Sequence, residues 1–149
     1  MSRNYYSEIN LHIVWHTKNS SPILTPTIEP LAHRALRQRV VATGGAFVHE
    51  IGGTETHVHL AVSIIPTITI SDWIGQLKGG SSHDVNQQSG KGYKALQWQT
   101  GYGVVSFGTG DLDWVRSYIR NQREHHKAGT VFDRLERITE IESGEIFEG

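Results

Sequence analysis

Apolar and polar residues alternate near the start of the chain, between residues 8 and 17, where Ile9, Leu11, Ile13 and Trp15 occupy every second position. Side chains of a strand point alternately to the two faces of a sheet, so this pattern predicts a β-strand. From about residue 27 the apolar residues change to helical spacing, and the ATGG stretch ends this predicted helix. A loop rich in turn-forming residues joins the two elements.

Two more strands are predicted at residues 46–51 and 56–64, and the short stretch GGTE between them indicates a hairpin connection. A helix is predicted over 69–82, because its apolar residues share one helical face. Residues 83–94 are polar and predict a loop. Residues 95–108 predict a strand that is interrupted at two glycines.

The clearest helical pattern covers residues 111–127, with acidic residues in its first turn and basic ones at its end, as the helix dipole favours. The predicted order is therefore β-α-β-β-α-β followed by a helix. This order indicates the α+β class, with a ferredoxin-like (split β-α-β) four-stranded antiparallel sheet covered by helices on one face. The other face is left for a ligand, for the last helix or for a second subunit.

Composition and charge limit the possible classes of protein. The 149 residues suit one domain, and the lack of cysteine excludes a disulfide framework and a thiolate metal site. No apolar run is long enough to span a bilayer or to act as a signal peptide, so we expect a cytoplasmic protein without a membrane partner. Residues 1–132 carry 12 basic and 9 acidic groups, which permits phosphate binding, whereas residues 133–149 form an acidic C-terminal tail.

Two histidines stand on either side of one valine in the third predicted strand. His57 and His59 therefore point to one face of the sheet, whereas Val58 and Leu60 point to the other. Two imidazoles on one strand face can converge on a metal ion. A polar face that simply meets solvent is the alternative interpretation.

A metal ion needs a third ligand, and the sequence leaves two candidates open. Glu55 lies on the same strand face as the histidines, and Gln122 lies on the last predicted helix. Trp114, Tyr118 and Gln122 follow at intervals of four residues and share one helical stripe. Tyr118 can be an ordinary packing residue, or it can be a nucleophile beside a cation that also polarises the target.

Four motifs, HVHL, LKGGSS, WQTGYGVVSF and YIRNQREHHK, occur in this order along the chain. In this respect the sequence resembles the insertion-sequence-200-like transposases, which are small single-tyrosine members of the HUH nuclease group (histidine, hydrophobic residue, histidine). The resemblance runs from about residue 8 to residue 133. It implies a single HUH transposase domain at 1–132, with the tail at 133–149 outside it.

The resemblance implies that His57, His59 and Gln122 bind Mg²⁺ or Mn²⁺, and that Tyr118 lies on a C-terminal catalytic helix. Tyr118 is then expected to cleave and rejoin single-stranded DNA through a 5′-phosphotyrosine intermediate, and so to move an insertion sequence. Members of the family act as homodimers with composite active sites, in which the tyrosine helix of one subunit completes the histidine site of the other. They recognise single-stranded DNA hairpins at the element ends.

Several polar residues are candidates for DNA binding by position alone. Lys78 and Ser81 lie in LKGGSS, where backbone amides and a lysine could hold a phosphate, although a plain glycine helix end is an equal alternative. Two other functions stay open: a domesticated hairpin-binding protein without strand transfer, and a metal-dependent hydrolase of small phosphoesters. The candidate DNA-binding residues are Lys18, Lys78, Ser81, Arg116, Arg120 and Arg123.

Overall fold

A computed structural model describes residues 4–138 of the chain. Four strands form one antiparallel sheet in the order β2-β3-β1-β4, so the two neighbours of the central strand β1 come from distant parts of the sequence. The predicted α+β class with a four-stranded antiparallel sheet is confirmed. The strands are β1 (Asn10–His16), β2 (Ala46–Gly53), β3 (His57–Ile64) and β4 (Gly103–Phe107).

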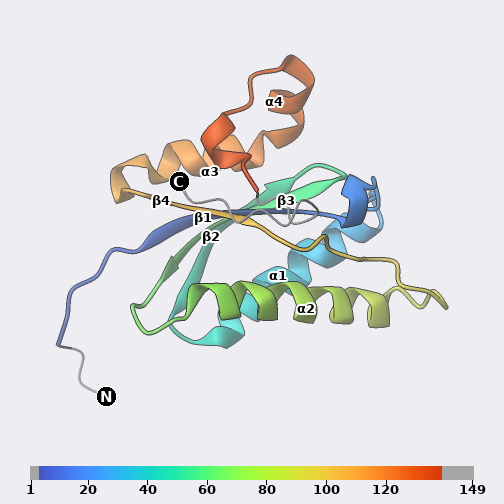
Figure 1. The fold of residues 1–149 in the computed structure, drawn as a ribbon, viewed down its shortest axis with the longest axis horizontal. Coiled ribbons are helices and arrows are strands. Elements are labelled where there is room, and N and C mark those ends of the chain that lie inside the picture. Colours follow the sequence, from blue (N-terminus) through green and yellow to red (C-terminus); the bar gives the residue numbers. More distant parts are fainter. Residues whose placement is uncertain (1–3, 139–149) are drawn as a thin grey trace.

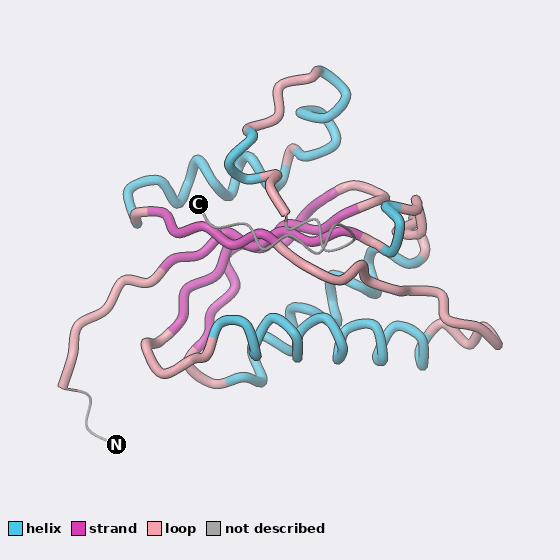
Figure 2. Tube along the Cα trace, viewed as in Figure 1, coloured by secondary structure: helices cyan, strands magenta, loops and turns pink. Residues whose placement is uncertain are grey.

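The helices cover both faces of the sheet, which lies between them in Figures 1 and 2. On one face α1 and α2 pack together, and on the other face α3 lies against β2 and β3 and continues into α4. Of the three occupants that the sequence allowed for this face, the last predicted helix, now α3 and α4, is therefore the one that covers it. The helices are α1 (Ile28–Thr43), α2 (Ile70–Gln88), α3 (Leu112–Arg120) and α4 (Gln122–Ala128), with single 3₁₀ turns at Lys18–Ser20, Thr109–Asp111 and Asp133–Leu135.

Strand alternation divides the core between the two faces. Ile13 and Trp15 of β1 are fully buried against α1 and α2, where they pack with Leu36 and other apolar residues. On the opposite face Ala61 packs against Ile119 of α3. A smaller cluster lies under the loop that leads to α1. The second face has only a small apolar contact, which leaves room for polar side chains beside it.

The predicted end of the second helix at residue 82 and the predicted loop at 83–94 are wrong in part, because α2 continues to Gln88. Leu77, Ser81 and Val85 are buried at intervals of four residues, so one face of the helix stays in contact with the core for two more turns. Burial on this face outweighs the low helix propensity of the two glycines in LKGGSS.

The predicted strand at 95–108 is shorter in the structure, where only Gly103–Phe107 joins the sheet as β4. Side chains of α2 form hydrogen bonds with backbone groups of the residues that precede β4. Asn86 bonds both the N–H and the carbonyl of Leu96, and Lys78 donates to two carbonyls further along the chain. Residues 97–99 form only an isolated antiparallel bridge to the end of β1, between Trp98 and Thr17, so this segment is an ordered loop beside the sheet rather than part of β4.

The helix predicted over 111–127 is broken at Asn121, whose φ of −102° and ψ of 27° separate α3 from α4. Beyond α4 the chain turns back, and the first residues of the predicted acidic tail, 133–138, pack on the domain, with Leu135 1% exposed. The rest of that tail, 139–149, lies outside the described residues. Within residues 4–138, no helix is long and apolar enough to cross a membrane.

Candidate metal centre and tyrosine site

The two histidines of the HVH motif lie on the face of β3 that α3 covers, as predicted. His57 is 3% exposed and His59 is fully buried, and their ring centroids are 4.9 Å apart. The Nδ1 atom of His57 lies 3.0 Å from the hydroxyl oxygens of both Thr54 and Thr56. These hydroxyls fix the ring and can accept a hydrogen bond from a protonated Nδ1. The Nε2 atom then carries no proton and can act as a metal ligand.

His59 is held in the same way by a third histidine. The Nε2 atom of His12, on β1, lies 2.8 Å from Nδ1 of His59, and both rings are buried. If Nδ1 of His59 donates this hydrogen bond, its Nε2 carries no proton and can bind a cation. That Nε2 atom is buried without a hydrogen-bond partner among residues 4–138, as expected of an atom that is built to bind an ion.

Tyr118 and Gln122 approach these histidines from the two sides of the break at Asn121. Tyr118 lies in the last turn of α3 at 3% exposure, and its ring centroid lies 6.2 Å from that of His59. Gln122 begins α4 and is fully buried, with its Oε1 atom 3.2 Å from Nε2 of His57. One chain therefore brings together the four residues that the resemblance implied. Glu55, the alternative third ligand, is exposed in the turn between β2 and β3.

Sequence reasoning missed an acidic residue at the centre of this group. The Oε1 atom of Glu136 lies 3.3 Å from Nε2 of His59 and 3.6 Å from Nε2 of His57. Its other oxygen accepts a hydrogen bond from the Tyr118 hydroxyl, which itself accepts one from the backbone N–H of Phe132 at 2.8 Å. His126 of α4 adds a third imidazole, with Nε2 3.3 Å from the same Oε1 atom.

The electrostatics of the site follow from burial and from the carboxylate. Burial lowers the pKa of His57 to about 3, so its imidazole is neutral, as a metal ligand must be. Burial would raise the pKa of the Glu136 carboxyl, but the neighbouring His59 and the Tyr118 hydroxyl lower it to about 2. Burial and Glu136 together raise the pKa of Tyr118 to about 12, so its phenol keeps its proton.

The donor set fits a divalent cation. One ligand atom from each of four residues lies within 4.8 Å of the others, and the residues are His57, His59, His126 and Glu136. The Oε1 atom of Gln122 borders the same space, 3.1 Å from Nε2 of His126. Imidazoles together with carboxylate and amide oxygens suit Mn²⁺ and other divalent ions of intermediate hardness.

Two of the predicted DNA-binding residues hold the protein's own backbone or side chains, and of these Ser81 is buried whereas Lys78 is half-buried. The ammonium of Lys78 donates to the carbonyls of Gln99 and Gly101 at 2.6 Å and 2.8 Å, and burial lowers its pKa to about 8. The hydroxyl of Ser81 donates to the Lys78 carbonyl and accepts a hydrogen bond from the indole of Trp98. Both side chains anchor the loop before β4 to α2, and neither sits at a helix end.

Three predicted basic residues are exposed but form ion pairs with glutamates. Arg116 and Arg120 both approach Oε1 of Glu50, at 3.6 Å and 3.0 Å. Arg123 binds Glu29 of α1 through two hydrogen bonds. Exposed pairs of this kind are weak, so the pairing lowers the local charge without preventing DNA contact.

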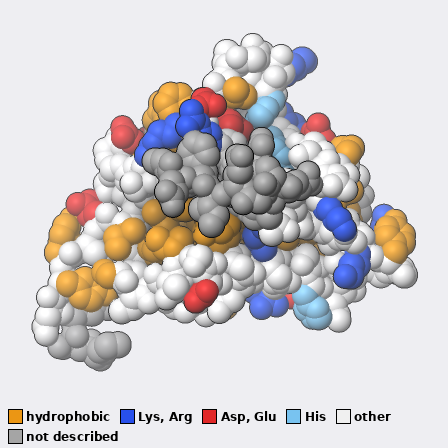
Figure 3. All heavy atoms as spheres, viewed as in Figure 1, with side chains coloured by type: hydrophobic (Ala, Val, Ile, Leu, Met, Phe, Trp, Pro, Cys, Tyr) orange, Lys and Arg blue, Asp and Glu red, His pale blue; other side chains and the backbone are white. Residues whose placement is uncertain are grey.

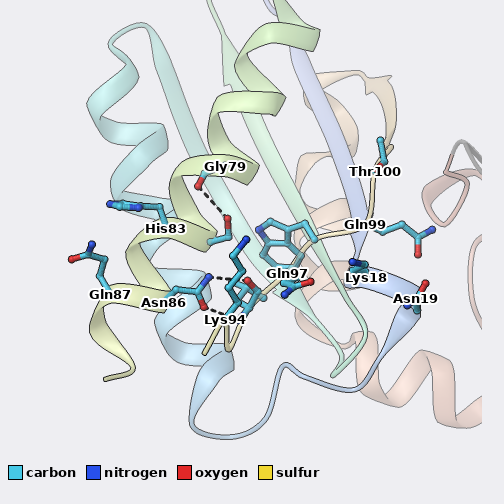
Figure 4. Close-up of a pocket in the computed structure, with 13 residues that line it drawn as sticks. Lys18, Asn19, Gly79, His83, Asn86, Gln87, Lys94, Gln97, Gln99 and Thr100 are labelled. Carbon is cyan, nitrogen blue, oxygen red and sulfur yellow. Dashed lines mark hydrogen bonds between the residues drawn. The ribbon is translucent and has the colours of Figure 1, made fainter. Parts of the chain in front are cut away.

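The remaining predicted residue, Lys18, lines a cavity of about 790 Å³ between the second half of α2 and the loop before β4 (Figure 4). Lys94 and His83 line it as well, together with glutamine side chains, and no carboxylate is present among the described residues that line it. Several Lys and Arg side chains lie at the right of Figure 3, and another group lies at its upper left. Lys18 lies two residues after His16, whose ring stacks on His57, but the cavity is on the α2 side of the sheet, whereas His57 and His59 lie on the face that α3 covers.

The chain is similar to known transposases in sequence and in fold. The chain is 24% identical over 126 residues to the ISDra2 transposase TnpA of Deinococcus radiodurans. The aligned residues cover 82% of this chain and 89% of that protein. A crystal structure of a candidate transposase from the same organism superposes with a TM-score of 0.63 at 21% identity, covering 82% of this chain and 96% of the other.

A second structure, a tyrosine transposase bound to a hairpin of the REP type, has a TM-score of 0.59 at 18% identity and covers 88% of this chain and 75% of its own. These likenesses define the fold as that of the small DNA transposases. The profile of the family "Transposase IS200 like" matches residues 5–122, which is most of the chain. The protein belongs to this family of IS200-like transposases.

Proposed function

We propose that the protein is a DNA transposase that cleaves and rejoins single-stranded DNA through a 5′-phosphotyrosine link to Tyr118, in a metal-dependent reaction that moves an insertion sequence. One observation carries this proposal. A tyrosine hydroxyl and a histidine pair, from segments about sixty residues apart, meet at one cluster of metal-ligating atoms in which both of these histidines are buried. The predicted cytoplasmic location is part of this proposal, because the protein must reach its DNA substrate.

His57, His59 and Gln122 would hold the divalent cation, Mg²⁺ or Mn²⁺, in this proposal. When bound, the cation supplies Lewis-acid polarisation of the scissile phosphate and neutralises its charge. The protein supplies the nucleophile and the placement. The phenol oxygen of Tyr118 forms a bond to phosphorus and loses its proton, while the bond from phosphorus to the 3′ oxygen breaks. The electron pair of the broken bond stays on that oxygen, which takes up a proton and leaves as a 3′-hydroxyl.

The enclosed position of Tyr118 suits a covalent intermediate. Trp114 stacks on the Tyr118 ring at a centroid distance of 5.6 Å, and the His125 ring lies 4.7 Å away on α4. These rings restrict the approach of water to the tyrosine oxygen. Hydrolysis of the phosphotyrosine would waste the bond energy that rejoining requires, so restricted access of water favours strand transfer.

The cavity beside Lys18 is the surface that we propose for the bound DNA strand. Lys18 and Lys94 supply positive charge, and the glutamine amides of the lining can both donate and accept hydrogen bonds, as base edges require. Trp98 lines the same cavity and offers an aromatic face. A strand lying here would reach the histidine site past His16. We propose that the same cavity contributes to recognition of the DNA hairpins that the resemblance implies.

The predicted homodimer with composite active sites also remains a proposal. The structure assembles tyrosine and histidines within a single chain, and the same residues would meet if two copies exchanged α3 and α4. Mixing two inactive variants, Tyr118→Phe and His57→Ala, separates these arrangements. Restored cleavage in the mixture supports composite sites, whereas continued inactivity supports a site within one chain.

A covalent-trapping assay tests the proposed reaction. The protein is incubated with Mn²⁺ and labelled single-stranded oligonucleotides from the DNA that flanks its gene, and then denatured. We expect a labelled adduct from the wild type and from Tyr93→Phe, whose tyrosine is 66% exposed and lies away from the site. The Tyr118→Phe variant lacks only a hydroxyl and should give none.

The other outcomes have distinct meanings. An adduct in Tyr118→Phe means that another residue is the nucleophile. Hairpin binding without any adduct from the wild type points instead to a domesticated binding protein. Neither binding nor adduct, together with turnover of small phosphoesters, points to the metal-dependent hydrolase.

A further inference from the structure

Glu136 is the one member of the cluster whose presence neither the sequence patterns nor the family match accounts for. It lies beyond the matched residues 5–122, on the segment 133–138 that folds back over the site. Its side chain is 16% exposed, and its carboxylate is directed at the histidines rather than at the exposed arginines of its own segment. The neighbouring Asp133, by contrast, is exposed and pairs with Arg137.

The spacing of the donor atoms around Glu136 matches the edges of a metal-ligand shell. Ligand atoms at about 2.0–2.2 Å from one ion, at angles between octahedral and tetrahedral values, lie about 2.8–3.6 Å from one another. The Oε1 atom of Glu136 lies 3.3, 3.3 and 3.6 Å from Nε2 of His59, His126 and His57. Gln122 fits the same pattern, since its Oε1 atom lies 3.2 Å and 3.1 Å from two of these nitrogens.

The imidazoles do not need Glu136 as a hydrogen-bond partner. Thr54 and Thr56 hold Nδ1 of His57, and His12 holds Nδ1 of His59, so each ring is fixed from the side away from the carboxylate. With these bonds in place the Nε2 atoms can be unprotonated, and a carboxylate oxygen close to bare nitrogens is unfavourable without a cation between them. The arrangement is therefore that of a ligand set.

We propose that Glu136 is a further ligand of the divalent cation, through Oε1, and that its Oε2 atom holds the hydroxyl of Tyr118 beside that cation. The inference rests on the metal site of the proposed function and deepens it. The carboxylate links the nucleophile to the ion, so the position of the tyrosine oxygen depends on the same side chain that completes the coordination. It also supplies the one negative charge in a donor set that otherwise consists of neutral imidazole and amide groups.

A metal titration without DNA tests this inference separately from cleavage. The full chain is titrated with Mn²⁺, and free and bound Mn²⁺ are measured by electron paramagnetic resonance. We expect Glu136→Gln to weaken Mn²⁺ binding at least about 10-fold, because loss of a charged ligand should exceed the effect of losing a supporting residue. Asp133→Asn is the matched control: it removes the same charge from the same segment and should bind as the wild type does.

Thermal unfolding with and without Mn²⁺ provides a second readout that does not depend on activity. Mn²⁺ should raise the midpoint of the wild type and of Asp133→Asn, and should raise that of Glu136→Gln much less. This comparison also shows that the variant is folded, since its own midpoint is measured in the same experiment. Tyr118→Phe should bind Mn²⁺ within a few-fold of the wild type.

Two results would overturn the inference. The first is Mn²⁺ binding by Glu136→Gln that is no weaker than binding by Asp133→Asn, which would leave the two HVH histidines and Gln122 as the ligand set. Glu136→Ala could instead bind more tightly than the wild type, which would mean that the carboxylate obstructs the site. In either case covalent trapping through Tyr118 can still succeed, so failure here is distinct from failure of the proposed function.

Discussion

A methyl group added at Gly103 of β4 provides a way to move Glu136 without changing it. A Cβ atom at this position would overlap the carbonyl oxygen of Arg137 and come to 2.9 Å from its carbon. Both are backbone atoms of the segment that carries Glu136, so no side-chain rotation can relieve the contact. The other close atom is Cγ1 of Val14, at 3.1 Å. Gly103→Ala must therefore displace either the β4 backbone or the 133–138 segment.

The expected size of the effect follows from two competing costs. Complete detachment of the segment would expose Leu135, which is 1% exposed, at about 1.5–3 kcal/mol. It would also break the hydrogen bond between Tyr118 and the Glu136 carboxylate, which adds about 1.5–3 kcal/mol. Accommodation of the methyl by small shifts costs about 1–3 kcal/mol. Accommodation is cheaper, so the segment should stay attached in a shifted position.

We therefore expect Gly103→Ala to lower the free energy of unfolding by about 1–3 kcal/mol, measured by urea denaturation. We also expect Mn²⁺ binding to weaken about 10-fold, since the ligand set tolerates little displacement. Gly108→Ala is the control, because a Cβ there meets nothing within 4 Å. Wild-type stability and wild-type Mn²⁺ affinity in Gly103→Ala would refute the reasoning, since they would show that the segment does not pack on β4.

Three further predictions concern other parts of the domain. Lys78→Met removes two hydrogen bonds to backbone carbonyls and should destabilise the fold by about 1–3 kcal/mol in urea denaturation, whereas Lys94→Met should not. Burial lowers the pKa of His12 to about 3 from 6.5, so stability present above pH 6.5 should fall as the pH drops towards 3, and denaturation of His12→Gln should show a shallower decline. Lys18→Ala and Lys94→Ala should each reduce the salt dependence of single-stranded DNA binding by about one counterion, and an unchanged slope would place the DNA elsewhere.

Features that depend on neighbouring residues could be predicted from the order of amino acids alone. Period-two alternation predicted β1 and β3, and it correctly placed His57 and His59 on one face with Val58 and Leu60 on the other. This prediction is reliable because strand geometry fixes the direction of successive side chains before any tertiary contact forms. The α+β class follows from the order of such elements. The resemblance added the link between these histidines and Tyr118, which no local pattern provides.

Contacts between side chains that are distant in the sequence became visible only in the folded chain. Lys78 is a free surface lysine by its sequence context, yet the loop before β4 folds over it and turns it into an internal anchor. Glu136 is one of several glutamates near the C-terminus, and nothing adjacent in the sequence sets it apart. It becomes part of the site because the 3₁₀ turn that contains the buried Leu135 packs against β1 and β4, which brings the Glu136 carboxylate to the Tyr118 hydroxyl. Long-range packing of this kind is set by the shape of the whole core, and the spacing of residues along the chain does not record it.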